Sequence, residues 1–196
     1  KYGSKLAVLE GDLLLSFGLK ELSETNLEIL KIFSDKIQKT LSGEIEQNST
    51  LNHFLNEEEY LNKTFNKTGN LFFAGLESLF CLKEINKNEK NSLLKFLKNY
   101  TLAFQIKNDI DNFKENSSSD FENGNYTLPV IYFKQKYGVR ESDFSEIDFS
   151  SENFKACLLK AKEKVEKLKK EAINSLETFE NSKYKEALIE ICAITL

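Results

Sequence analysis

Proline, glycine and histidine are scarce in this chain, and each shortage excludes a class of structure or chemistry. Proline occurs once among the 196 residues, as Pro129, and there are only eight glycines. Because short strands need turn-forming residues at regular spacing, an all-β fold is not expected. The single histidine, His53, excludes a histidine-rich metal site and gives little support to a Ser-His-Asp triad.

Cysteine, long apolar runs and basic charge are also in short supply. The three cysteines, Cys81, Cys157 and Cys192, stand far apart in apolar surroundings, so we expect thiols in the core and no metal site. This sparse, odd set, with no signal-peptide pattern at the start, predicts a cytoplasmic protein. No apolar run approaches the roughly 18–20 residues of a membrane span. The net charge of −4 argues against a nucleic-acid partner.

Helical periodicity is what the sequence does contain. Hydrophobic residues make up 40% and charged residues 30% of the chain, which indicates a globular protein of one domain. The clearest amphipathic helix has apolar residues at positions 154, 158, 161, 165, 168, 172, 176 and 179. Other helices are expected over 5–22, 25–47, 56–81, from Asn88 or Asn91 to about 113, 127–138 and 184–194. The pattern predicts a single-domain, all-α helical bundle over residues 1–196, with about seven helices.

Local signals set the expected helix boundaries. Residues 25–28 (TNLE) have the spacing of a capping box, in which Glu28 reaches back to Thr25. Asn56 is a second cap, because the acids that follow it suit the positive end of a helix. Pro129 suits the first turn of a helix and Gly138 the end of the same helix. The expected connections are residues 114–125 and 139–150.

A polar cluster lies inside a strongly helical pattern at residues 104–113, which read FQIKNDIDNF. Asparagine and aspartate are poor residues for a helix interior, because their side chains compete for backbone hydrogen bonds. One helix face carries Gln105, Asn108, Asp109 and Asn112, and a separate apolar stripe carries Leu102, Ala103, Ile106, Ile110 and Phe113. The polar face is either part of a binding site or the fraying end of a helix.

Five short segments, in a fixed order along the chain, carry the pattern of a known family. They are residues 2–14 (YGSKLAVLEGDLL), 43–47 (GEIEQ), 67–71 (KTGNL), 103–107 (AFQIK, continuing into the polar cluster) and 120–129 (DFENGNYTLP). Together they resemble the medium- and long-chain, octaprenyl-type trans-polyprenyl diphosphate synthases, which have the isoprenoid synthase fold. The resemblance covers almost the whole chain. It implies that the chain is the C-terminal two-thirds of the family domain and is incomplete at its N-terminus.

The resemblance implies an activity and its partners. Members of the family condense isopentenyl diphosphate with an allylic diphosphate to make a trans-polyprenyl diphosphate. The allylic diphosphate ionises, so the enzyme stabilises the departing negative charge with Mg²⁺ and shields the carbocation from water. The family usually forms homodimers through long antiparallel helices. We therefore expect a magnesium-dependent prenyltransferase that is a homodimer.

Roles for individual residues follow from the same resemblance. Lys67 would bind a diphosphate, Thr68 would support the same site, and Gln105 would lie near the allylic group. The full set implied for substrate is Lys67, Thr68, Gln105 and Lys107, and the set implied for metal is Asp109, Asn108 and Asn112. Asp12 is expected to be a buried structural carboxylate. Glu44 and Gln47 would either face the cavity or join two helices.

The sequence departs from the family pattern at three places. The Asp-Asp-x-x-Asp motif reads Asn108-Asp109-Ile110-Asp111-Asn112, so two carboxylates have become amides and the metal site should be weaker. The first aspartate-rich motif would lie upstream of Tyr2. Asn125 stands where the family usually has a lysine.

Several explanations of these departures stay open. The chain is expected to be the remainder of a longer protein, but a short subunit whose partner carries the first motif, or a pseudoenzyme kept for assembly, also fits. The alternative function is therefore a non-catalytic partner subunit or dimerisation module. A class I terpene synthase fits Asn108-Asp109, but Asn112 and Asn116 stand where that family's metal motif has Ser or Thr and Glu.

Overall fold

The computed structural model describes residues 3–49, 53–113, 118–138 and 147–196, and within these ranges it contains helices and no strand. The predicted all-α fold is confirmed. In chain order the elements are α1 (Ser4–Ser23), α2 (Leu27–Ser49), α3 (Glu57–Thr64), the π-helical turn η1 (Phe65–Gly69), α4 (Asn70–Leu82), α5 (Lys87–Asp111), α6 (Ser119–Glu122), α7 (Leu128–Tyr137), α8 (Glu152–Ser175), the 3₁₀ turn η3 (Leu176–Thr178) and α9 (Lys183–Thr195). The helix predicted over 56–81 is present as α3, η1 and α4 in succession.

Two predicted helix starts are right. At α3, Asn56 Oδ1 accepts a hydrogen bond from the Glu59 backbone N–H at 3.0 Å, and Glu59 Oε2 accepts from the Asn56 N–H at 2.8 Å. This reciprocal pair is a complete capping box. At α7, Pro129 lies in the first turn, and the helix ends at Gly138, which has the left-handed φ of 63° that glycine tolerates.

Three boundary predictions are wrong. The cap of α2 is Asn26, whose Oδ1 accepts from the Glu28 N–H at 2.7 Å, while the Thr25 hydroxyl donates back to the carbonyl of the preceding helix. Helix α5 starts earlier than expected, because Asn86 and not Asn88 or Asn91 caps it. The short helix α6 lies inside a segment expected to be a loop. Because several neighbouring polar residues are good N-caps, the sequence alone does not tell which one caps the helix.

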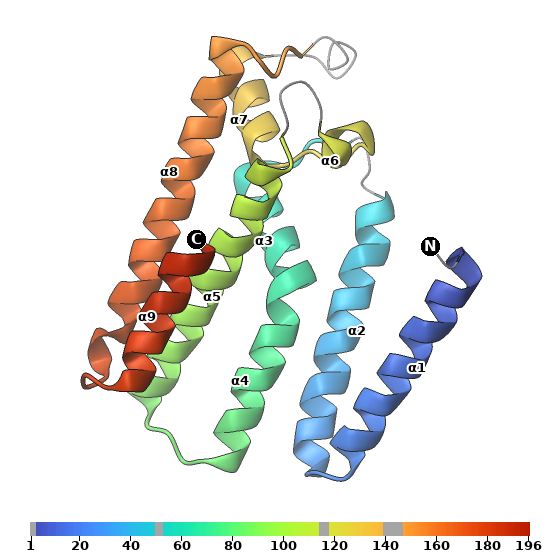
Figure 1. Ribbon diagram of the computed structural model, residues 1–196, viewed down its shortest axis with the longest axis vertical. Coiled ribbons are helices and arrows are strands. Elements are labelled where there is room, and N and C mark those ends of the chain that lie inside the picture. Colours follow the sequence, from blue (N-terminus) through green and yellow to red (C-terminus); the bar gives the residue numbers. More distant parts are fainter. Residues whose placement is uncertain (1–2, 50–52, 114–117, 139–146) are drawn as a thin grey trace.

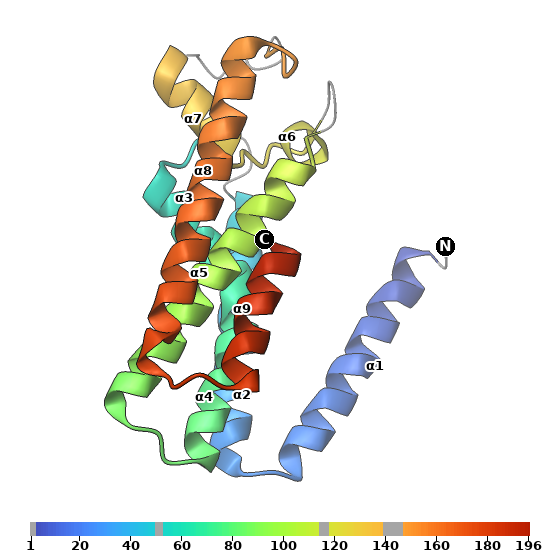
Figure 2. The same cartoon turned by 60° about the vertical axis from the view of Figure 1, so that its left-hand side comes forward.

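The main core lies between α5 and α8, which run side by side in Figure 1 and Figure 2. The predicted apolar stripe of α5 faces inward, and Ala103 and Ile106 are completely buried. The stripe of α8 meets it with Ala161 and Val165. Because both stripes repeat every three or four residues, the two helices stay in contact along their length.

A second cluster joins α9 to the same pair of helices. It consists of Phe96, Tyr100, Ala172, Leu176 and Cys192. All three cysteines are free; Cys157 and Cys192 are buried, as expected of core thiols, and Cys81 is partly exposed.

Helix α1 lies at the edge of the molecule beside α2, separated from the α5–α8 pair in both views (Figures 1 and 2). None of its residues is buried. The prediction that Asp12 is a buried carboxylate is therefore wrong, because no other described element covers this helix. The large apolar side chains that it exposes are Leu6, Val8, Leu9, Leu13, Leu14, Leu15, Phe17 and Leu19. Over the ranges that the structure describes, no helix combines the length and apolar character needed to cross a membrane.

Candidate functional site

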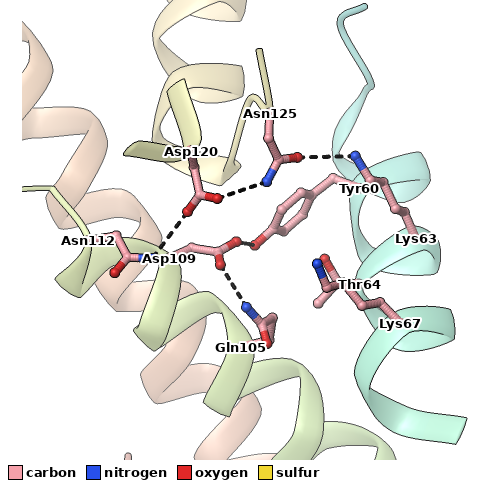
Figure 3. Close-up of a pocket in the computed structure, with 9 residues that line it drawn as sticks. All are labelled: Tyr60, Lys63, Thr64, Lys67, Gln105, Asp109, Asn112, Asp120 and Asn125. Atoms are coloured by element: carbon pink, nitrogen blue, oxygen red, sulfur yellow. Dashed lines mark hydrogen bonds between the residues drawn. The ribbon is translucent and has the colours of Figure 1, made fainter. Parts of the chain in front are cut away.

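A polar pocket lies between the α3–η1 segment and the C-terminal half of α5, with the α6 region forming its rim (Figure 3). Its lining residues are Tyr60, Lys63, Thr64, Lys67, Gln105, Asp109, Asn112, Asp120 and Asn125. Four of the seven residues predicted from the sequence, Lys67, Gln105, Asp109 and Asn112, thus meet in one place. Three of the four residues of the predicted polar face, Gln105, Asp109 and Asn112, therefore line this pocket, and Asn108 does not.

The wall opposite α5 contains the π-helical turn η1. A π-turn inserts one extra residue into a helix and changes the direction of the side chains around it, and such turns are common at functional sites. Gly69 leaves room for the ring of Phe65, because a Cβ atom at position 69 would lie 2.6 Å from that ring and displace it. The turn carries Lys67 into the pocket lining and Thr68 towards α5.

Asp109 is the centre of a buried hydrogen-bond network. Its Oδ2 accepts from the Tyr60 hydroxyl at 2.6 Å, and its Oδ1 accepts from Gln105 Nε2 at 2.8 Å (Figure 3). The Thr68 hydroxyl in turn donates to Gln105 Oε1 at 3.1 Å. Thr68 does not line the pocket, but it orients the amide that holds Asp109, so the predicted supporting role has a geometric basis.

Burial dominates the acid–base properties of this network. The Asp109 side chain is almost completely buried, and burial raises its pKa to about 6, although the hydrogen bonds from Tyr60 and Gln105 oppose the rise. The nearby Asp120 carboxylate raises the pKa further, and Lys67 lowers it. Burial, followed by the charge of Asp109, raises the pKa of Tyr60 well above its ordinary value. Tyr60 therefore stays a hydrogen-bond donor at neutral pH.

The rim of the pocket is a second chain of hydrogen bonds, centred on Asp120. Asn112 Nδ2 donates to Asp120 Oδ2 at 3.1 Å, and Asn125 Nδ2 donates to Asp120 Oδ1 at 3.2 Å. Asn125 Oδ1 accepts from the Lys63 ammonium at 3.1 Å. One of the amides that replaces a family carboxylate, Asn112, thus holds another carboxylate in place.

Tyr60, Lys63 and Asp120 were not predicted as site residues. For Tyr60 and Lys63 a signal was present, because they precede Lys67 by seven and four residues and so share its helix face. For Asp120 the signal was its place in a family segment, but only the fold brings it to α5.

Lys67 also makes an ion pair outside the network. Its ammonium lies 3.1 Å from Glu44 Oε1 on α2, and both side chains are about two-fifths exposed, at 43% and 39%. Glu44 therefore joins two elements of the bundle, which was one of its two predicted roles. The side chain of Gln47 lies outside the described part of the structure.

Lys107 and Asn108 do not line the pocket. The Lys107 ammonium pairs with Asp111 at 2.6 Å on the exposed side of α5. Each step along a helix turns the side chain by roughly 100°, so a direct neighbour of Asp109 does not share its face. The geometry gives no support to the substrate role of Lys107 or the metal role of Asn108.

Comparison with known proteins identifies the family. The family model described as polyprenyl synthetase matches residues 1–176. The chain belongs to the polyprenyl synthetase family.

Relatives in this family align with nearly the whole of this chain. A prenyl transferase of Cyanidium caldarium is 32% identical over 97% of this chain and 64% of its own length. Solanesyl diphosphate synthase 1 of Arabidopsis thaliana, a chloroplastic protein, is 29% identical over 100% of this chain and 52% of its own length. The chain therefore spans about half to two-thirds of these relatives.

Solved structures show the same fold. A polyprenyl synthase from Roseobacter denitrificans matches 98% of this chain and 70% of its own with a TM-score of 0.83 and 22% identity. A polyprenyl synthase from Caulobacter crescentus, complexed with calcium and isoprenyl diphosphate, matches 99% of this chain and 66% of its own with a TM-score of 0.80 and 24% identity. At this identity the likeness establishes the isoprenoid synthase architecture.

The residues of this pocket suit a metal ion that is also bound by substrate phosphates better than an ion held by protein ligands alone. Among the described residues, no group of three or more His, Cys, Asp or Glu side chains is placed to hold a metal. Asp109 and Asp120 face the same pocket, and Asn112 turns its amide nitrogen towards Asp120 (Figure 3). Mg²⁺ is commonly held by one or two carboxylates together with substrate phosphates and water. These residues fit such an ion and do not fit a cage of protein ligands alone.

Proposed function

We propose that the protein is a polyprenyl diphosphate synthase that condenses isopentenyl diphosphate with an allylic diphosphate, and that this chain supplies one diphosphate-binding half of its active site. The observation that carries the proposal is the pocket in which Lys67 faces the Asp109 network. A cation on one wall and ordered carboxylates on the other suit a diphosphate that binds together with a divalent cation.

Each residue of the pocket has a part in this proposal. Lys67 would release Glu44 and bind the diphosphate, stabilising the charge that develops as the allylic C–O bond breaks. Tyr60 and Gln105 keep Asp109 in a single orientation. Asp109 and Asp120 would hold Mg²⁺, which supplies positive charge to the departing diphosphate.

The assembly and the compartment are proposed on separate grounds. The uncovered apolar side chains of α1 support a homodimer, because a long helix with no buried residue in one chain gains stability when another surface covers it. The three free cysteines support a reducing compartment such as the cytoplasm. The acidic net charge supports the absence of a nucleic-acid partner.

A second function, a non-catalytic partner subunit, is favoured by one observation. All four oxygens of Asp109 and Asp120 already accept hydrogen bonds from Tyr60, Gln105, Asn112 and Asn125. A subunit kept for assembly would retain such a closed network without needing metal. The terpene synthase alternative has weaker support, because Asn112 hydrogen-bonds to Asp120 and Asn116 lies outside the described residues.

An elongation assay separates the two functions. The full-length protein that contains this chain is incubated with labelled isopentenyl diphosphate, farnesyl diphosphate and a series of Mg²⁺ concentrations, and we expect a longer prenyl product. The Lys67→Gln variant should lose most of this product, because it removes the cation and keeps a side chain of similar length. Wild-type protein that is folded but gives no product at any Mg²⁺ concentration would favour the non-catalytic subunit.

A further inference from the structure

The pocket contains a second lysine that neither the family motifs nor the sequence pattern assigns. Lys63 lies in α3, four residues before Lys67, and both side chains line the pocket (Figure 3). In a helix this spacing places two side chains on the same face, with Cβ atoms roughly 5–6 Å apart. The wall opposite Asp109 therefore presents two ammonium groups, and the proposed function uses only one of them.

The contacts of Lys63 differ from those of the other lysine. Lys67 has a carboxylate partner, Glu44. The direct partner of Lys63 is the neutral amide of Asn125, and no carboxylate of the described residues lies within ion-pairing distance of its ammonium. The Lys63 side chain is half-buried, and this burial, together with repulsion from Lys67, lowers its pKa, although the more distant carboxylates of Asp109, Glu44 and Asp120 oppose the shift. A half-buried cation without a directly paired anion favours the binding of an anionic ligand.

We infer that Lys63 is a second diphosphate-binding residue, positioned by Asn125, which contacts one phosphoryl group of the ligand while Lys67 contacts the other. This inference rests on the proposed function, because it names a further contact of the same site. A diphosphate carries two phosphoryl groups, so two cations one helical turn apart match it better than one does. The Asn125 amide holds the Lys63 ammonium at the rim without neutralising its charge.

Binding of inorganic pyrophosphate tests the inference directly. Isothermal titration of the full chain, with and without Mg²⁺, gives the Kd for wild type and for Lys63→Gln, Lys63→Arg and Lys67→Gln. We expect Lys63→Gln to weaken binding about tenfold or more, which is the loss of one hydrogen bond to a charged group. Lys63→Arg keeps the charge and should stay within about threefold of wild type.

The salt dependence of Kd separates a ligand contact from a structural role. Removal of a cation that touches the ligand should make binding less sensitive to ionic strength, whereas a folding defect would lower the fraction of active protein and leave this sensitivity unchanged. Lys95→Gln is the matched control, because Lys95 is an exposed lysine of α5 that does not line the pocket. Circular dichroism melts of all variants report folding.

The outcomes distinguish the two proposals. Wild-type affinity in Lys63→Gln, together with weakened binding in Lys67→Gln, would overturn the role of Lys63 and leave the proposed function intact. Failure of folded wild-type protein to bind pyrophosphate, with or without Mg²⁺, would overturn both. Weakened binding in Lys63→Gln with the salt dependence of wild type would also reject the direct contact.

Discussion

Helix α5 carries two polar pairs of the same spacing on different faces. On the pocket face, Gln105 donates to Asp109 at 2.8 Å; on the outer face, Lys107 donates to Asp111 at 2.6 Å. The outer pair has the opposite charges and the shorter distance, yet both of its members are exposed to solvent. The pocket pair contains a single charge, buried and joined to Tyr60 and Thr68 through further hydrogen bonds.

The difference between the pairs shows that burial, and not the distance between the atoms, decides what a polar contact does. Water screens the outer pair, so its contribution to stability is small. Around Asp109 water is largely excluded, so each hydrogen bond is harder to replace and the pKa of the carboxyl group is raised. We expect substitutions on the two faces to differ in size and in their dependence on pH.

The largest effect is expected for Asp109→Asn, as a change in how the free energy of unfolding depends on pH. Burial raises the folded-state pKa of Asp109 from 3.8 to about 6. Between these values the folded state keeps a proton that the unfolded state has lost, so this contribution to stability is present at pH 4 and is lost as the pH rises through 6. The Asp109→Asn variant lacks this pH-dependent contribution. The free energy of unfolding of wild type minus that of the variant should fall by on the order of 3 kcal/mol from pH 4 to 7.

Urea unfolding followed by circular dichroism at several pH values measures this difference. Asp111→Asn is the matched control on the outer face, and its difference from wild type should stay nearly constant over the same range. A flat profile for Asp109→Asn would mean that Asp109 titrates like an exposed carboxylate, and the contrast between the faces would disappear.

Tyr60→Phe should have the next largest effect. The substitution keeps the buried ring and removes the hydroxyl that donates to Asp109 Oδ2, leaving that oxygen without its protein donor. We expect a loss of about 1–3 kcal/mol in the free energy of unfolding at pH 7. Tyr137→Phe removes a hydrogen bond to Asn153 at the surface and should cost less than about 0.5 kcal/mol. Equal losses in the two variants would argue against a special role for burial.

The smallest effect is expected for Lys107→Gln on the outer face. Loss of its exposed pair with Asp111 should change the free energy of unfolding by about 0.5 kcal/mol or less. Because Lys107 does not line the pocket, the Kd for pyrophosphate should change less than about twofold. A tenfold loss of pyrophosphate affinity would restore the substrate role that the family resemblance implied for this residue.

Local sequence patterns predicted the structure correctly where only one residue could fill a given position. The helix cap at Asn56 and the buried apolar stripe of α8 were predicted, because each depends on neighbours within a few residues along the chain. Prediction failed where several residues could serve, as with Thr25 and Asn26, or where distant segments had to be known. Asp12 was expected to be buried, but no described element covers α1.

The residues of the candidate site fall into the same two groups, those that local spacing could bring together and those that it could not. Gln105, Asp109 and Asn112 could be grouped from the sequence, because helical spacing alone places them on one face of α5. Lys67 joined them through the family resemblance. Asp120 and Asn125 could not be placed, because their contacts join segments up to 62 residues apart.

The sequence by itself determined that the chain is helical, which stripes are apolar and that one face of α5 is polar, because these properties depend on a repeat of three to four residues. The tertiary structure decided that Asp109 on this face is buried against Tyr60 and that Lys63 enters the same pocket. The physical reason is that pKa values and the strength of polar contacts depend on how much water surrounds them. The water around a side chain is set by segments that the local pattern does not contain.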